Sequence, residues 1–271
     1  MESDIAQALR LETEPVALLL VDEKPEGAAQ FSAGSRSCVM FMLSSAARGK
    51  TAVFDRCSYG CPGGGVGLGF GHIYEKFPGG VPGFCHFLSQ GNEQDPAGKA
   101  IGEGMQAAGA PADFVDHFLH GERYKKSPKE AEQFVDALPI QDVPTKFVVL
   151  KPLSQVDPEK EAPVSVTLLV NADQLSALVI LANYDRPGLE SVAVPYAAAC
   201  QVMGILSYRE AEAEHPRALI GLTDISARKY LKAQGMGDKL TFTVPFGRFL
   251  EMEENVPGSF LTGSTWAAVI E

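Results

Sequence analysis

Five cysteines carry the most distinctive chemistry in this sequence, and two of them border an unusual glycine-rich segment. They are Cys38, Cys57, Cys61, Cys85 and Cys200. Cys57 and Cys61 stand four positions apart at the start of residues 57–71, where seven of fifteen residues are glycine. Thiolates are soft ligands that suit zinc and iron–sulfur clusters, and backbone without side chains can bring its N–H groups close to such a group. The pattern predicts a metal ion or an iron–sulfur cluster bound by cysteines beside a glycine-rich loop.

Two other interpretations of the same region remain open. Gly63, Gly64 and Gly65 could hold a small anionic ligand, with the turn from Ser226 to Arg228 at the start of a helix as the other half of that site. Cys61 could instead be the nucleophile of a thiol-dependent enzyme. The glycine spacing does not match the dinucleotide-binding fingerprint, and no Walker A sequence occurs, so nucleotide binding is less favoured. No reaction follows from the sequence.

The composition limits the class of protein and its partners. The chain has 271 residues, of which 45% are hydrophobic and 21% charged, so it can form a real core and is not a disordered chain. Its net charge of −11 argues against a nucleic acid as partner. The longest apolar runs, such as 16–21, are much shorter than the roughly 20 residues of a membrane-spanning helix. The first residues do not resemble a secretory signal, and the number of cysteines is odd. We therefore expect a cytoplasmic protein without a disulfide framework, whose partner is a small molecule or an electron-transfer protein.

Hydrophobic patterns predict the elements that must position the cysteines. Strands are expected over residues 16–21, 51–54, 147–150, 164–170, 191–194, 218–222 and 240–244. The last of these alternates polar and apolar residues, which is typical of a half-buried strand. Helices are expected over residues 4–11, 38–48, 111–120, 128–138, 174–183, 195–203, 225–232 and 246–253. Strands that alternate with helices favour an α/β or α+β fold with a mixed sheet and flanking helices. We expect one domain over residues 1–271, with a weak subdomain boundary near 139–145.

The most specific motifs resemble an uncharacterised prokaryotic family, domain of unknown function 169. They are Cys38, the run Gly60-Cys61-Pro62-Gly63-Gly64-Gly65 with its continuation to Gly71, Cys200 after Val194-Pro195-Tyr196, and the stretch from Gly221 to Arg228. The resemblance covers nearly the whole chain and brings no established activity with it. It implies that Cys38, Cys61 and Cys200 form a converging set, with Cys57 as a candidate fourth ligand. Three thiolates would leave one iron of a cluster open to a substrate or an external ligand.

Overall fold

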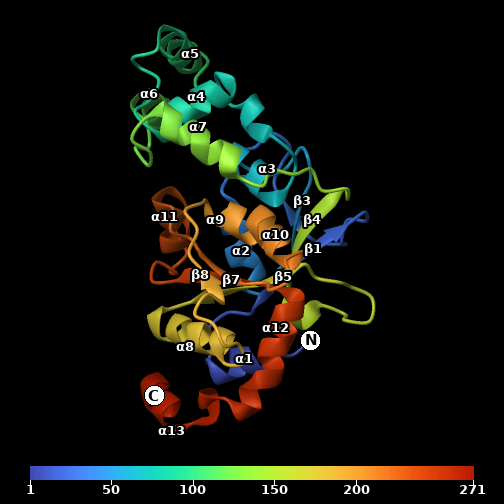
Figure 1. Ribbon diagram of the computed structural model, residues 1–271. Helices are drawn as coiled ribbons and strands as arrows, with labels where there is room; N and C mark the ends of the chain where they lie inside the picture. Colours follow the sequence, from blue (N-terminus) through green and yellow to red (C-terminus); the bar gives the residue numbers. More distant parts are fainter. The chain divides into compact units, whose positions relative to one another are not determined.

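A mixed sheet of eight strands organises most of the chain in the computed structural model, which describes residues 1–271 (Figure 1). The strands are β1 (Val16–Val21), β2 (Ala29–Gln30), β3 (Ala52–Phe54), β4 (Phe147–Pro152), β5 (Ser165–Val170), β6 (Val192–Ala193), β7 (Ala218–Gly221) and β8 (Leu240–Pro245). Their order in the sheet is β2-β3-β4-β1-β5-β8-β7-β6. The two edge pairs, β2 with β3 and β6 with β7, are parallel, and the central pairs are antiparallel. The predicted mixed sheet with flanking helices is confirmed, and the fold is of the α/β class.

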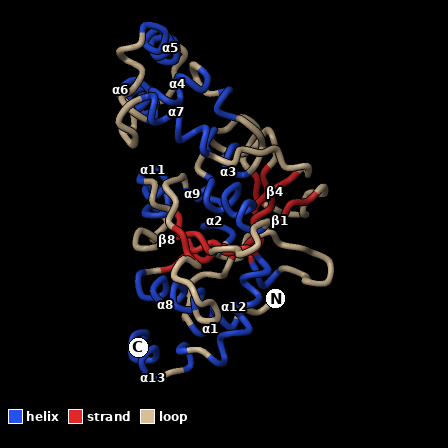
Figure 2. The backbone as a smooth tube through the Cα atoms, viewed as in Figure 1, coloured by secondary structure: helices blue, strands red, loops and turns tan.

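Helices account for most of the remaining structure (Figure 2). The α-helices are α1 (Asp4–Ala8), α2 (Val39–Ala46), α3 (Pro62–Leu68), α4 (Gly80–Leu88), α5 (Pro96–Ala107), α6 (Ala112–His120), α7 (Pro128–Ala137), α8 (Ala172–Asn183), α9 (Ala199–Gln201), α10 (Ser207–Ala211), α11 (Ile225–Ala233), α12 (Phe246–Asn255) and α13 (Ser264–Ile270). Short 3₁₀ turns are η1 (Ile73–Lys76), η2 (Leu153–Gln155), η4 (Val256–Gly258) and η5 (Phe260–Thr262), and the π-helical turn η3 (Val202–Leu206) joins α9 to α10. No helix is both long and apolar enough to cross a membrane.

The sheet is covered on both faces because its strands carry apolar residues in both of their alternating positions. One face presents residues such as Leu19, Val166 and Phe242 to a core that α8 and α12 complete. Helices α2 and α10 lie on the other face (Figure 1). Because the sheet is packed on both faces, the helices that follow its strands have fixed starting points.

Strand β8 corrects one expectation, because it is buried on both faces rather than half-buried. Its threonines, Thr241 and Thr243, are fully buried beneath the helices. The hydroxyl of Thr243 lies 2.9 Å from that of Thr167 on the neighbouring strand β5, and the two share a hydrogen bond. A partner across the strands satisfies the buried hydroxyl of Thr243, whereas the hydroxyl of Thr241 is buried without a hydrogen-bond partner. Alternation alone therefore did not identify an exposed face.

The chain divides into two compact units, each described here by itself. The larger unit comprises Met1–Gly71 and Gln141–Glu271 and contains the whole sheet, and the smaller comprises His72–Ile140. The smaller unit is helical, and aromatic rings form its core: the rings of Tyr74 and Phe84 are stacked with centroids 3.8 Å apart. The predicted boundary near 139–145 spans the division between Ile140 and Gln141.

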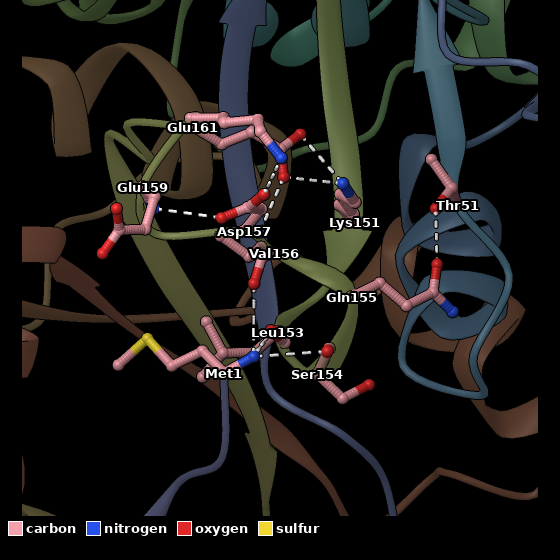
Figure 3. A network of polar contacts seen from close by, with 11 residues as sticks. Met1, Thr51, Lys151, Leu153, Ser154, Gln155, Val156, Asp157, Glu159 and Glu161 are labelled. Carbon is pink, nitrogen blue, oxygen red and sulfur yellow. Dashed lines mark hydrogen bonds and ion pairs between the residues drawn. The ribbon is translucent and has the colours of Figure 1, made fainter.

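Polar contacts fasten the connection between β4 and β5 in the larger unit (Figure 3). The Lys151 ammonium on β4 donates to both carboxylate oxygens of Glu161, at 2.8 and 2.7 Å. The amino group of Met1 donates to the carbonyl oxygens of Leu153, Ser154 and Val156, each at 3.2 Å. These bonds place the start of α1 beside the end of β4.

The glycine-rich segment was expected to be a loop, and for residues 62–68 that expectation is wrong. These residues form α3, with Pro62 in its first turn and Cys61 as the preceding cap. Proline suits the first turn of a helix, and Gly69 ends α3 in the left-handed conformation with φ 88°. Glycine is a poor helix former, so local propensity does not explain α3. Its packing does.

The glycines allow the backbone of α3 to lie directly against that of α9 and η3. A Cβ placed on Gly67 would come within 2.6 Å of the carbonyl carbon of Cys200, and one placed on Gly204 within 1.9 Å of the carbonyl oxygen of Gly67. No side chain fits at either position. The hydroxyl of Tyr208 on α10 donates to the carbonyl oxygen of Leu68 at 3.1 Å and closes the same contact at its other end.

Substitution of either glycine by alanine tests this contact. We expect Gly67→Ala and Gly204→Ala each to lower the free energy of unfolding by roughly 1–3 kcal/mol or more, because the added methyl group must push two backbones apart. The control is Gly247→Ala in α12, where a Cβ would meet nothing within 4 Å. That variant should be unchanged, or more stable by up to about 1 kcal/mol. Denaturant unfolding measures all three, and a Gly67→Ala protein as stable as its parent would contradict the close packing.

Candidate functional site

Three of the five cysteines stand at the starts of helices in the larger unit. Cys38 is the cap of α2, Cys61 is the cap of α3, and Cys200 lies in the first turn of α9. A fourth helix start contributes Asp224, the cap of α11. The carboxylate of Asp224 accepts a hydrogen bond from the backbone N–H of Ala199 at 3.0 Å, which joins the starts of α11 and α9.

A single peptide group connects two of the sulfurs. The Sγ of Cys61 accepts from the N–H of Gly64 at 3.3 Å, and the thiol of Cys200 donates to the carbonyl oxygen of Gly63 at 3.2 Å. These N–H and C=O groups belong to the same peptide unit in the first turn of α3. Residues 139 positions apart in the chain therefore flank the glycine backbone that the sequence singled out.

The three thiols and the Asp224 carboxyl influence one another electrostatically. The pKa of Cys38 is raised to about 12, mainly by burial and in addition by the nearby Cys61 and Asp224. Burial also raises the pKa of Cys200, followed by the effects of Cys61, Asp224 and Cys38. The pKa of Cys61 is raised by burial and by Asp224. Without a ligand these thiols are therefore protonated at neutral pH.

Backbone N–H groups oppose these shifts at each sulfur. Met40 and Phe41 in the first turn of α2 lower the pKa of Cys38, Gly63 and Gly64 lower that of Cys61, and Gln201 lowers that of Cys200. Each helix start thus directs N–H groups at its own sulfur, where they would stabilise a thiolate.

Asp224 is the one residue of this group that the sequence analysis did not single out. Burial raises the pKa of its carboxyl from 3.8 to about 6, against the opposing effects of the backbone N–H of Ala199 and of Arg228. The one signal that pointed to it was its position inside the motif Gly221 to Arg228. Its proximity to the thiols results from the strand order, which a single sequence does not reveal.

The other two cysteines have different surroundings. Cys57 is exposed. The pKa of the Tyr59 hydroxyl is raised mainly by burial and, to a smaller extent, by the nearby thiol of Cys57. It does not figure among the main electrostatic influences on Cys38, Cys61 or Cys200. Cys85 is buried in the smaller unit, and its pKa is raised to about 11, mainly by burial.

No group of three His, Cys, Asp or Glu side chains could hold a metal ion as the side chains stand. The thiols are neighbours, but they do not form a site for one ion. Direct coordination of a single zinc by Cys38, Cys57, Cys61 and Cys200 thus finds no support in the geometry.

The residues considered for an anion site have structural roles. Gly63, Gly64 and Gly65 lie in the first turns of α3, and a Cβ on Gly64 would come within 2.6 Å of the Tyr59 carbonyl oxygen. The Arg228 guanidinium donates to the carbonyl oxygens of Leu222, Gly237 and Lys239, which ties α11 to the turn before β8. Ser226 lies in the first turn of α11, after the cap residue Asp224, whose carboxylate accepts from the N–H of Ala199 and not from the start of α11.

Fold and site together define a mixed α/β protein with three neighbouring thiols and a carboxyl group at the starts of four helices. Comparison with known families identifies the family of the chain. Residues 4–255 match the DUF169 family, described as Uncharacterised ArCR, and the chain belongs to that family. No curated protein and no solved structure matches the chain.

The raised pKa of Asp224 predicts a specific pH dependence of stability. A carboxyl whose folded pKa is about 6 instead of 3.8 favours the folded state when protonated, and that stabilisation is lost as the pH rises through about 6. We therefore expect Asp224→Asn, whose amide oxygen can still accept from Ala199, to stabilise the ligand-free protein by about 1–3 kcal/mol at pH 7. At pH 4 the gain should be much smaller.

Thermal unfolding between pH 4 and pH 8 measures this difference. The control is Asp113→Asn on the exposed surface of α6, which should follow the pH profile of the unchanged protein. Equal stability of Asp224→Asn and its parent at every pH would show that the carboxyl is not withdrawn from water.

Proposed function

We propose that this protein binds an iron–sulfur cluster through the thiolates of Cys38, Cys61 and Cys200. Asp224 stands beside the three thiols as an oxygen donor for the iron that they leave without a cysteine. The observation that carries the proposal is the shared peptide group of Gly63 and Gly64, which bonds to the sulfurs of both Cys61 and Cys200. Cys38 is close enough to raise the pKa of Cys200, and Asp224 is close enough to raise the pKa of all three thiols.

The spacing of the thiols favours a cluster over a single ion. Ligands of one zinc ion lie close together because each Zn–S bond is only about 2.3 Å long. No such group is formed here, and the width of a peptide group separates the hydrogen-bond partners of Cys61 and Cys200. A cluster spreads its cysteine ligands over its corners and tolerates this larger separation.

The backbone around the sulfurs also suits a cluster. Hydrogen bonds from N–H groups to cluster sulfurs are one of the means by which proteins set its reduction potential. The glycine turn of α3 supplies N–H groups at Cys61, and Met40 and Phe41 in the first turn of α2 supply them at Cys38. Limited exposure of the thiols would protect the cluster from water and oxygen.

Protonation of the free thiols is compatible with this function. Because burial and the neighbouring groups raise their pKa values, the thiols are neutral at pH 7 without a ligand, and the fold does not have to hold three thiolates side by side. Cluster binding would displace the three thiol protons, so loading should improve with rising pH. The same raised pKa argues against Cys61 as a nucleophile, which needs a lowered one. A small molecule or an electron-transfer protein is the partner class that such a cluster would serve.

Anaerobic purification after expression with added iron tests the proposal. We expect iron and acid-labile sulfide in equal amounts, together with the visible absorption of a cluster. Cys38→Ser, Cys61→Ser and Cys200→Ser should each lose most of the iron. The matched controls Cys57→Ser and Cys85→Ser remove a thiol outside the site and should keep it.

Two outcomes would overturn the proposal. One is protein that stays free of iron and sulfide after anaerobic reconstitution although it is folded. The other is zinc without sulfide, which would indicate a single-ion site after rearrangement of the side chains.

A further inference from the structure

A second feature lies in the smaller unit, which contains none of Cys38, Cys61 and Cys200. It is a cavity of about 320 Å³ lined by Ser89, Gln90, Arg123, Lys125 and Lys126. Three of its five lining residues are cations, and none is acidic. In a chain with a net charge of −11, such a local excess of positive charge is unusual.

The cations of this unit are concentrated at the cavity. Residues 72–140 contain six lysines and arginines, and four of them fall between Arg123 and Lys129. Arg123 and Lys126 are exposed and form no ion pair with a carboxylate. The ammonium group of Lys125 lies 5.1 Å from the centre of the Phe134 ring, which fixes its direction. Like charges gathered in this way repel one another unless an anion lies between them.

The acidic residues of the same segment are engaged elsewhere. Glu122 lies beside His117, with 3.9 Å between Oε1 and Nδ1. Glu130 accepts from the hydroxyl of Ser127 at the start of α7, and Lys126 and Lys129 lower its pKa in addition to that hydrogen bond. Neither carboxylate lines the cavity.

The cations are also not needed to complete the fold. Lysine and arginine often serve the carbonyl groups at the end of a helix, and α4 ends beside this segment. Those carbonyl groups are already bonded: Phe87 accepts from the N–H of Glu122 at 2.7 Å, Leu88 from that of Tyr124 at 3.0 Å, and Ser89 from that of Arg123 at 3.0 Å. The backbone satisfies the helix end, so the guanidinium of Arg123 and the ammonium of Lys126 are not needed there.

We propose that this cavity binds a small phosphate-bearing molecule, with Arg123 and Lys126 as the main contacts and Lys125 and Gln90 beside them. A guanidinium group and an ammonium group are the donors that phosphate oxygens prefer. The volume is at the lower end of the range for small-ligand pockets, which suits a compact polyanion such as a pyrophosphate. This site shares no residue with the proposed cluster site, and the two proposals are independent of each other.

Calorimetric titration of the full-length protein with pyrophosphate tests the proposal. We expect saturable binding in the micromolar to millimolar range that weakens as salt is added. Arg123→Gln and Lys126→Gln should each weaken binding by about tenfold, because each removes a charge-assisted hydrogen bond. Lys99→Gln and Lys129→Gln remove cations of the same unit that do not line the cavity, and they should change the affinity by less than about twofold.

Circular dichroism confirms that each variant is folded, and Arg123→Gly provides a second variant at a position where the backbone is left-handed with φ 57°. Absence of binding at millimolar pyrophosphate would overturn the proposal, as would equal losses in the cavity variants and the controls. Tight binding of a single-stranded oligonucleotide, without binding of pyrophosphate, would assign the cations to a nucleic acid instead and would also overturn it.

Discussion

The direct contact between the backbone of α3 and that of α9 and η3 is the constraint on which the candidate site depends. It requires Gly67 and Gly204, because a methyl group on either would overlap main-chain atoms of the facing helix. The contact places the first turn of α3 beside Cys200, and so lets one peptide group bond to two thiols from distant parts of the chain. The glycine content of residues 57–71 thus has a packing cause, and the chemistry follows from it.

A second consequence concerns charge. Burial of three thiols and a carboxyl group beside one another is unfavourable for their ionised forms, and the pKa of each is raised. The N–H groups at the helix starts offset only part of this effect. A cationic ligand would favour the ionised forms, since it attracts thiolates and a carboxylate that would otherwise repel one another. Without a ligand the three thiols are therefore neutral at pH 7.

Sequence patterns predicted the sheet well and the glycine-rich helix badly. The apolar run Val16–Val21 and the alternating residues of β8 predicted strands correctly, and the helices expected over residues 4–11 and 174–183 correspond to α1 and α8, which Ser3 and Asn171 cap. Helix α3 was missed because glycine has a low intrinsic propensity for helices, and only the facing backbone makes it the required residue. Helices α4 and α5 were missed for a similar reason, since both contain glycine and proline.

The candidate site was predictable in its cysteines but not in its carboxyl group. The resemblance to the family implied that Cys38, Cys61 and Cys200 converge, and the structure brings their helix starts together. Asp224 joins them through the order of β7 and β8 in the sheet, which local spacing does not encode. Cys57 was favoured by its closeness to Cys61 in sequence, yet it is exposed and acts on Tyr59.

Iron X-ray absorption of the anaerobically purified protein is the most direct test of the central claim. The account predicts iron surrounded mainly by sulfur, with a short iron–iron distance that only a cluster produces, and one light-atom neighbour that disappears in Asp224→Ala. Iron with nitrogen and oxygen neighbours and no second iron nearby would contradict it.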